Sequence, residues 1–553
     1  MTEKNSSAAK NLVRGCIKSQ LGRIILSSLL SFVSSVTYIV LALFSKKTID
    51  IAAGEDTGNL VVLAISIIGL VLLQVICAAY MSHLKVATAG KMAVSVRKNL
   101  FTSLMSKQLS GVNEYHSGDL LNRFTSDTDV VVNTASSIIP TVVSIVSRII
   151  AGTIAILTID WKFAAGLIII GITVPCVCKL IGHKYRYLHT RYQQSDGRLK
   201  SFLQESFKNL SVIKSFSSLL PTHKKLDRLQ YENFSIKIKR NNLSIVYSMG
   251  MYLFFTAGYF LVLLWGAAGI KAGSVTYGSL LAFLQIISQL RAPMQNISGI
   301  APTYYSMISS AQRITEIDDL NEELSPLDEA VTDAIKNVFT CINAEKLSFS
   351  YGEHKILKEC EFSVKRGSIT AITGESGVGK STLFRLLLGY ETAEGSLSFD
   401  NKYQINSSTR SLFSYVPQGN MILSGTIREN VTLCTVNADD DAIENAMQIA
   451  QLSDFIESLP KGLDTYIGED GLGISDGQAQ RIAIARAILC DAPVLLLDEA
   501  TASLDSDTEY RLLKEIKKLS DKTVLLVTHR SLPDDICDNL IHLEDGKFQN
   551  KQN

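Results

Sequence analysis

The feature that most constrains this chain is a set of long apolar runs confined to its first 310 residues. The first run, residues 24–44, carries no charged residue over 21 positions. At about 1.5 Å per residue, such a helix crosses the roughly 30 Å hydrocarbon core of a bilayer. Five similar runs follow, at residues 60–81, 130–159, 163–181, 243–270 and 277–311. The sequence therefore predicts an α-helical, polytopic membrane domain with six transmembrane helices.

Basic residues predict how this domain is oriented. They gather in the two long segments that follow the second and fourth runs, and the positive-inside rule places both segments in the cytoplasm. Apolar residues recur there at helical spacing, so these segments are predicted to extend the membrane helices. Six crossings return the chain to its starting side. We expect a multi-pass protein of a bacterial cell membrane, with a cytoplasmic segment (1–23), a transmembrane domain (24–313), a linker (314–338) and a cytoplasmic domain (339–553).

The C-terminal domain contains a glycine-rich loop that is a candidate phosphate-binding site. It follows the apolar run 369–373 and precedes a helical pattern, and its residues are Gly374, Glu375, Ser376, Gly377, Val378, Gly379, Lys380, Ser381 and Thr382. The glycines allow backbone N–H groups to turn toward phosphate oxygens at a helix N-terminus. Lys380 would reach the β- and γ-phosphates, and the Ser381 hydroxyl would ligate Mg²⁺. The sequence predicts an α/β P-loop domain that binds ATP and Mg²⁺.

Two carboxylates complete the predicted site. The apolar run 494–497 ends in Asp498 and Glu499, and a second apolar run ends at His529. Asp498 would hold Mg²⁺ beside Ser381, while Glu499 would polarise the attacking water. The net charge of +1 argues against a nucleic-acid partner. Among nine cysteines only Cys176 and Cys178 are closely spaced, and we interpret them as packed thiols.

These motifs resemble those of ATP-binding cassette (ABC) half-transporters of the exporter type, over nearly the whole chain. The resemblance implies that Tyr351 stacks on adenine and that Gln418 contacts Mg²⁺ and the transmembrane helices. It also implies that His529 contacts the γ-phosphate and that Glu499 is catalytic. Residues 97–127 and 204–216 are similar to the two coupling-helix regions, and the segment around Glu469 is similar to one that meets the cytoplasmic loops in exporters.

The family signature is present with one departure. Ser475, Gly477 and Gln478 match it, whereas Asp476 stands where the family usually has glycine. The resemblance implies a dimer in which Ser475 of one chain faces Lys380 of the other across ATP. A homodimer is favoured because Glu499 and His529 are both present, and a heterodimer remains an alternative. The carboxylate of Asp476 is expected either to weaken nucleotide binding or to point to solvent.

The resemblance implies ATP hydrolysis that drives export of an amphipathic peptide, drug or lipid. An importer on the same fold and an ATP-gated channel or regulator are the alternatives. Arg148 and Arg291 fall near the middle of predicted spans that contain no acidic residue. A charge at this depth usually faces a bundle interior or a wet cavity. These arginines are therefore expected either to have a structural role, by bonding backbone carbonyls freed by Pro293 or extending toward the inner headgroups, or to contact a carboxylate or phosphate on the cargo.

Overall fold

The structure is a computed structural model that describes residues 3–159, 184, 187–188, 190–216, 219–419, 422–435, 438–468, 473–490, 492–530, 533 and 535–551. It divides into two compact units. Unit 1 contains Met1–Met105 and His116–Asp319, and unit 2 contains Ser106–Tyr115 and Leu320–Asn553. Each unit is described by itself.

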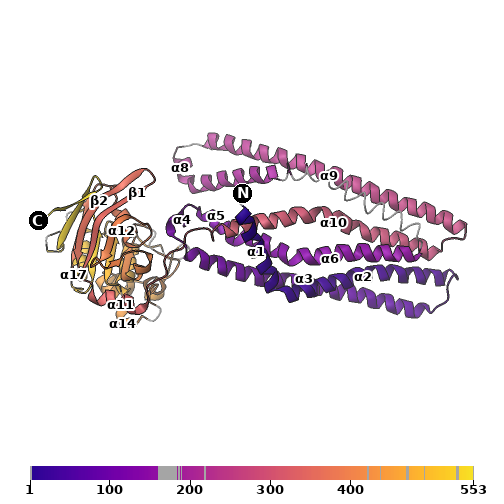
Figure 1. The fold of residues 1–553 in the computed structure, drawn as a ribbon, viewed down its shortest axis with the longest axis horizontal. Coiled ribbons are helices and arrows are strands. Elements are labelled where there is room, and N and C mark those ends of the chain that lie inside the picture. The colour runs from indigo at the N-terminus through magenta and orange to yellow at the C-terminus, as the bar shows by residue number, and fades with distance from the viewer. Residues whose placement is uncertain are drawn as a thin grey trace. The chain divides into compact units, whose positions relative to one another are not determined.

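Unit 1 is built from long helices that lie side by side (Figure 1). Its elements are α1 (Glu3–Ser19), α2 (Leu21–Ala52), α3 (Leu60–Met105), α5 (Ser117–Asn122), the π-helix η1 (Arg123–Asp127), α6 (Thr128–Ile159), α8 (Leu210–Ser215), α9 (Leu219–Lys271) and α10 (Tyr277–Thr315). Helix α6 packs against α2 and α10. The two segments predicted to be cytoplasmic and helical are largely helical where the structure describes them, since α3 continues to Met105 and α9 begins at Leu219.

Within the described residues, four helical segments are long and apolar enough to cross a membrane: Leu21–Ala52, Leu60–Met105, Ser117–Ile159 and Leu219–Lys271. They contain the first, second, third and fifth predicted spans. The fourth predicted span, residues 163–181 with Cys176 and Cys178, lies outside the described residues. The sixth coincides with α10, which is less apolar and contains Pro293 and Pro302. The count of six therefore stays a prediction.

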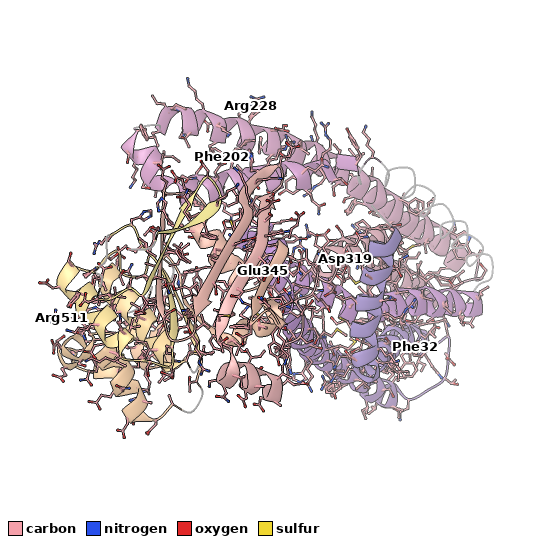
Figure 2. The ribbon with its side chains drawn as sticks, turned by 60° about the vertical axis from the view of Figure 1, so that its left-hand side comes forward. Phe32, Phe202, Arg228, Asp319, Glu345 and Arg511 are labelled. Atoms are coloured by element: carbon pink, nitrogen blue, oxygen red, sulfur yellow. The ribbon has the colours of Figure 1, made fainter. Side chains whose placement is uncertain are left out.

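Small side chains let α2 and α6 approach closely. Ser35 is fully buried, and its Oγ lies 3.2 Å from Ser144 Oγ and from the Ser144 carbonyl oxygen. Small residues at such interfaces bring backbones together where lipid provides no hydrophobic driving force. Large apolar side chains such as Phe32 on α2 are exposed on the outer surface of the apolar helices. Arg228, in the basic N-terminal part of α9, is also exposed (Figure 2). This partition is what a membrane-embedded bundle requires.

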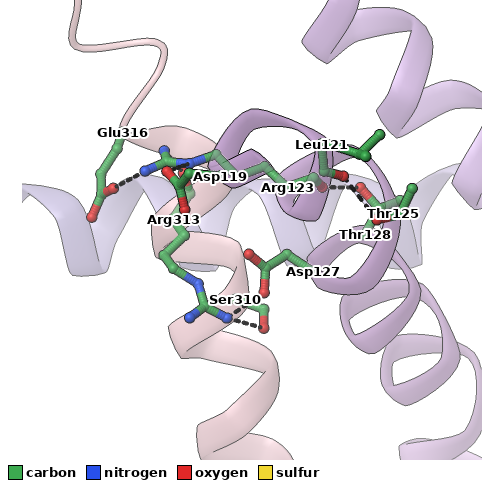
Figure 3. A network of polar contacts seen from close by, with 9 residues as sticks. All are labelled: Asp119, Leu121, Arg123, Thr125, Asp127, Thr128, Ser310, Arg313 and Glu316. Carbon is green, nitrogen blue, oxygen red and sulfur yellow. Dashed lines mark hydrogen bonds and ion pairs between the residues drawn. The ribbon is translucent and has the colours of Figure 1, made fainter. Parts of the chain in front are cut away.

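A polar network joins η1 to the end of α10 (Figure 3). The side chain of Arg123 is only 4% exposed, and its guanidinium contacts Asp119 at 3.1 Å and Glu316 at 2.8 Å. It also donates to the Arg313 carbonyl oxygen, and the Arg313 guanidinium in turn pairs with Asp127. A buried charge is tolerated only with such partners.

Unit 2 is an α/β domain with short helices and three sheets. Its helices are α4 (Leu109–Asn113), α11 (Glu329–Val338), α12 (Lys380–Leu387), η2 (Ser407–Leu412), α13 (Ile427–Val431), α14 (Asp440–Ile449), α15 (Ser453–Glu457), η3 (Gly462–Asp464), α16 (Asp476–Leu489) and α17 (Ser506–Lys517). The predicted linker 314–338 thus includes a helix, α11, whose Ile335 is buried in the core of this unit.

The strands of unit 2 form a six-stranded sheet, a four-stranded antiparallel sheet and a pair. They are β1 (Cys341–Tyr351), β2 (His354–Lys365), β3 (Ile369–Gly374), β4 (Glu394–Phe399), β5 (Tyr403–Gln404), β6 (Phe413–Val416), β7 (Gly425–Thr426), β8 (Tyr466–Ile467), β9 (Val494–Asp498), β10 (Thr523–Val527), β11 (Asn539–Glu544) and β12 (Lys547–Lys551). Their orders are β12-β11-β3-β10-β9-β6, β2-β1-β4-β5 and β7-β8.

The six-stranded sheet brings the predicted site residues to one edge. Strands β3, β10, β9 and β6 are parallel, and Val527 pairs with both Ile372 and Asp498. Strands β9 and β10 are buried at every position, which explains their uninterrupted apolar sequences. Because ligands bind outside the carboxyl ends of such strands, this edge is where a nucleotide site is expected.

Candidate active site

The glycine loop has a backbone that only glycine adopts readily. The φ angles of Gly374, Gly377 and Gly379 are 151°, 83° and 115°. A Cβ at Gly379 would lie 2.6 Å from Ile356 Cγ2 on β2, and one at Gly374 would collide with the Leu543 carbonyl oxygen. Glycine is therefore required at both positions. The loop leads into α12, whose N-terminus adds a partial positive charge.

Lys380 lies across the glycine loop. Its Nζ donates to the Gly374 and Glu375 carbonyl oxygens at 2.9 Å each and lies 3.3 Å from His529 Nε2. Burial lowers the pKa of the ammonium, and the nearby Glu499 and Asp498 carboxylates oppose that effect. The lysine is thus held at the loop by backbone oxygens, which an anionic ligand can replace.

The predicted metal ligands Ser381 and Asp498 are in contact. Ser381 Oγ donates to Asp498 Oδ1 at 3.1 Å, and Tyr415 Oη donates to Asp498 Oδ2 at 3.3 Å. Burial raises the pKa of Asp498, and the two hydrogen bonds act in the opposite direction. Burial also raises the pKa of Tyr415, so this hydroxyl stays a donor. The sequence analysis missed Tyr415, although it stands three residues before Gln418 on an apolar strand.

Glu499 is held between two other predicted residues. Gln418 Nε2 donates to Glu499 Oε2 at 2.6 Å, and His529 Nε2 lies 3.0 Å from Glu499 Oε1. The shorter of the two contacts of His529 Nε2 is to this carboxylate, so its proton is best placed on that nitrogen. Glu499 has a φ of 51°, a backbone that costs a non-glycine residue about 1 kcal/mol or more.

A second network that the sequence analysis missed supports the segment after Glu499. Arg530 Nη1 donates to Glu509 Oε2 at 2.7 Å and to the Leu504 carbonyl oxygen at 3.0 Å. Thr501 Oγ1 donates to Glu509 Oε1 at 2.6 Å. Glu509 is buried, and its two oxygens are satisfied by these two donors. The side chains that flank Glu499 and His529 are therefore fixed to α17.

Two other groups of predicted residues lie apart from this cluster. Tyr351 ends β1 with 41% of its surface exposed, and its ring packs edge-on against Phe349. Ser475 caps α16, and its amide donates to Gln478 Oε1 at 2.9 Å. Gly477 lies against the Ser503 carbonyl oxygen. In the described part of the chain, no hydrogen bond joins Ser475, Gly477 or Gln478 to the glycine loop. Glu469 lies outside the described residues.

The residues of the cluster fit ATP with Mg²⁺. The glycine cradle has no room for side chains at Gly374 and Gly379, and the Lys380 ammonium lies at its mouth. The Ser381 hydroxyl and the Asp498 carboxylate are adjacent oxygen donors, the ligand type that Mg²⁺ prefers. Gln418 is the third predicted metal ligand, and here its amide nitrogen contacts Glu499.

In unit 1, the two arginines that are predicted to lie near mid-membrane, Arg148 and Arg291, both contact aromatic rings. The guanidinium carbon of Arg148 lies 4.8 Å from the centre of the Tyr38 ring on α2, and that of Arg291 lies 4.5 Å from the centre of the Tyr252 ring on α9. Arg148 Nε is buried and makes no hydrogen bond among the described residues. No carboxylate of the described chain pairs with either arginine. Both charges are thus stabilised by cation–π contacts.

Comparison with known proteins agrees with both halves of this description. Residues 24–294 match the family of ABC transporter transmembrane regions, and residues 357–502 match the ABC transporter ATPase family. A solved structure of a bacterial Atm1-family ABC exporter with ATP bound has a TM-score of 0.79 at 21% identity, over 96% of this chain and 94% of that one. That similarity shows a common fold.

Curated relatives extend over most of the chain. The ATP-dependent lipid A-core flippase of Desulfotalea psychrophila is 30% identical over 82% of this chain and 80% of its own length. The flippase of the same name from Syntrophus aciditrophicus is 27% identical over 90% of this chain and 84% of its own length. The chain therefore belongs to the ABC transporter family, as a membrane-spanning half-transporter whose transmembrane region is fused to an ATPase domain that couples ATP hydrolysis to export.

Proposed function

We propose that the protein is a dimeric, alternating-access exporter of the bacterial cell membrane, and that its cargo is an anionic amphipathic lipid. The observation that carries the cargo class is the pair of mid-membrane arginines, Arg148 and Arg291, which have aromatic contacts but no carboxylate partner among the described residues. An unneutralised charge at this depth is costly. An acidic headgroup would supply the missing counter-ion.

In the proposed reaction, the residues of the cluster bind the phosphates, hold Mg²⁺ or orient the attacking water, and Gln418 has two of these roles. Lys380 binds the β- and γ-phosphates, and Glu499 accepts a hydrogen bond from the attacking water and orients it. His529 and Gln418 keep the Glu499 carboxylate in place, as their 3.0 and 2.6 Å contacts indicate. Ser381, Asp498 and Gln418 would hold Mg²⁺, which supplies positive charge that neutralises the phosphate oxygens. Tyr351 would stack on adenine.

The need for a second chain follows from the position of Ser475 and Gly477. Among the described residues, Ser475 bonds to Gln478, Gly477 lies against the Ser503 carbonyl oxygen, and no hydrogen bond joins either residue to Lys380 or Glu499. We propose that a second copy provides Ser475, Gly477 and Gln478 to each ATP. Closure of the two copies around two nucleotides and their release after hydrolysis would switch the membrane cavity between inward and outward access.

The relatives named as lipid A-core flippases support a lipid cargo. Proteoliposomes test it directly, with the ATPase domains facing outward and a trace of fluorescent lipid in the outer leaflet. On adding Mg²⁺ and ATP, a phosphatidylglycerol analogue should move to the inner leaflet and become protected from dithionite. A phosphatidylcholine analogue should stay accessible, because it has no net negative charge.

Equal protection of the two analogues would contradict the proposed charge selectivity. Failure of both analogues to become protected from dithionite in an ATP-dependent way would contradict lipid export itself. Liposomes with Glu499→Gln protein serve as the control for spontaneous and ATP-independent exchange.

A further inference from the structure

Helix α1 lies where the chain enters the membrane. It ends at Ser19, shortly before the first apolar run begins at Ile24. Figure 1 shows α1 crossing the long helices of unit 1 instead of running alongside them, and the turned view in Figure 2 agrees. Because the long helices span the bilayer, a helix that crosses them at this point lies along the surface of the membrane.

One face of α1 fixes this helix to the bundle. Ala9, Val13 and Cys16 recur at helical spacing, and they are 0%, 6% and 8% exposed. They belong to one apolar cluster with Met92 of α3 and Ile314 of α10. Since this face is buried, the rotation of α1 about its own axis is fixed, and its two flanks point in defined directions.

One flank of α1 points away from the bilayer. Its residues Leu12 and Gly15 line a cavity whose opposite wall includes Asn99 of α3 and Asp318 of α10. Asn99 and Asp318 both stand beyond the apolar runs of their helices, on the side that is predicted to be cytoplasmic. The other flank of α1 therefore faces the membrane surface.

Lys10 and Arg14 occupy the flank that faces the membrane. Each directly follows a residue of the buried face, whereas Leu12 and Gly15 directly precede one, so the two sets lie on opposite flanks of the helix. Both basic side chains are exposed, and within the described residues neither forms an ion pair or a hydrogen bond. Lys18, one turn further along, is exposed as well. The chain thus directs a row of cations without protein partners at the bilayer surface.

We propose that Lys10, Arg14 and Lys18 form a binding surface for the headgroups of anionic phospholipids in the cytoplasmic leaflet. Anionic lipids give this leaflet a negative surface potential, which attracts Lys and Arg side chains that lie within a Debye length of it. The guanidinium of Arg14 can donate two parallel hydrogen bonds to one phosphate, and the Lys10 ammonium adds a charge one turn away. This surface is separate from Arg148 and Arg291, so the lipid that it binds is a resident of the leaflet and not the proposed cargo.

The test uses the full chain in phosphatidylcholine nanodiscs that contain a phosphatidylglycerol analogue with a photoreactive diazirine on its headgroup. After irradiation and chymotryptic digestion, mass spectrometry should find the label on peptides of α1. Lys10→Gln combined with Arg14→Gln should lower this labelling at least about tenfold, because each charge near an anionic surface strengthens the attraction about fivefold. Lys10→Arg combined with Arg14→Lys keeps both charges and should retain the labelling.

The matched control is Lys224→Gln combined with Arg228→Gln, because this exposed pair on α9 has the same residue types at the same spacing. It should leave the labelling of α1 unchanged, and so should Arg148→Ala, which separates this surface from the proposed cargo contact. The proposal is wrong if a phosphatidylcholine analogue with the same diazirine labels α1 equally. It is also wrong if the glutamine pair on α1 leaves the labelling unchanged, or if the control pair lowers it as much.

Discussion

The charged residues of the ATP site in unit 2 and the arginines Arg148 and Arg291 of unit 1 have different kinds of partner. In unit 2, Asp498 accepts hydrogen bonds from Ser381 and Tyr415, and Glu499 lies within hydrogen-bond distance of Gln418 and His529. In unit 1, Arg148 and Arg291 have only aromatic partners among the described residues. We infer that the side chains of the ATP site are held in position by other residues of the same chain. The two arginines instead need a counter-ion from outside the chain.

Replacement of Glu499 by glutamine should produce the largest effect. The change keeps Asp498, Lys380 and the size of the side chain at position 499, but it removes the carboxylate that orients water. The rate of ATP hydrolysis should therefore fall about a hundredfold or more, while ATP still binds. Phosphate release and binding of a fluorescent ATP analogue measure the two quantities. The control is Glu515→Gln on α17, which pairs with Lys518 on the surface. Hydrolysis within about threefold of wild type, under ~1 kcal/mol in barrier, would show that Glu499 is not the catalytic base.

The next effect tests the membrane side of the comparison. Arg148→Ala and Arg291→Ala should each reduce the stimulation of ATPase activity by anionic lipid about tenfold, because each removes a desolvated charge from the proposed cargo contact. Basal ATPase activity should persist. Arg148→Lys and Arg291→Lys keep the positive charge and should retain most of the stimulation. If neutral and anionic lipids respond alike to the alanine changes, the arginines are structural.

Tyr415→Phe tests whether the hydrogen bond from Tyr415 to Asp498 holds this carboxylate in position for metal binding. The change keeps the ring against Phe384 but removes the donor to Asp498. The affinity for divalent metal with ATP should fall about fivefold, equivalent to the ~1 kcal/mol of one hydrogen bond. Mn²⁺ binding followed by electron paramagnetic resonance reports this without turnover. Tyr403→Phe on β5 is the matched control. Equal Mn²⁺ affinities for the two variants would show that the Tyr415 hydroxyl does not contribute to metal binding.

The smallest effect concerns Asp476. Its side chain is exposed in the first turn of α16, where a carboxylate favours the helix. Asp476→Asn should raise ATP affinity about twofold at low salt if the carboxylate repels the γ-phosphate, and the gain should shrink as salt screens the charge. Asp476→Gly gives the common family sequence and should behave similarly. Identical affinities at every salt concentration would mean that Asp476 points to solvent in the dimer.

The sequence predicted the parts of the site that are local in the chain. The glycine loop, the pair Asp498 and Glu499, and His529 each stand next to an apolar strand, and their chemistry follows from residue type and spacing. Tyr415 and Asp498 are 83 residues apart, so their contact depends on the pairing of β6 with β9. The bond between Arg530 and Glu509 likewise depends on tertiary packing, which no local pattern encodes.

Hydropathy was informative about the membrane but not about where helices end. The predicted span 24–44 stops at the first lysines, whereas α2 continues to Ala52. The helix accommodates these charges because Lys46 Nζ contacts Asp50 Oδ2 at 2.9 Å, and Asp50 Oδ1 also accepts from the Gly278 amide at 2.9 Å. An apolar run in the sequence indicates which part of a helix faces lipid. It does not indicate where the helix ends, because polar contacts such as Lys46 with Asp50 extend α2 beyond the apolar run.

The buried guanidinium of Arg123 has a mechanical consequence. Its partners Asp119 and Glu316 belong to segments almost two hundred residues apart, and separating them would leave a desolvated charge at a cost of roughly 3 to 5 kcal/mol. The start of α6 and the end of α10 should therefore move together as one rigid body. Any flexing during the transport cycle must occur elsewhere in the bundle, where helices slide past one another without exposing a buried ion.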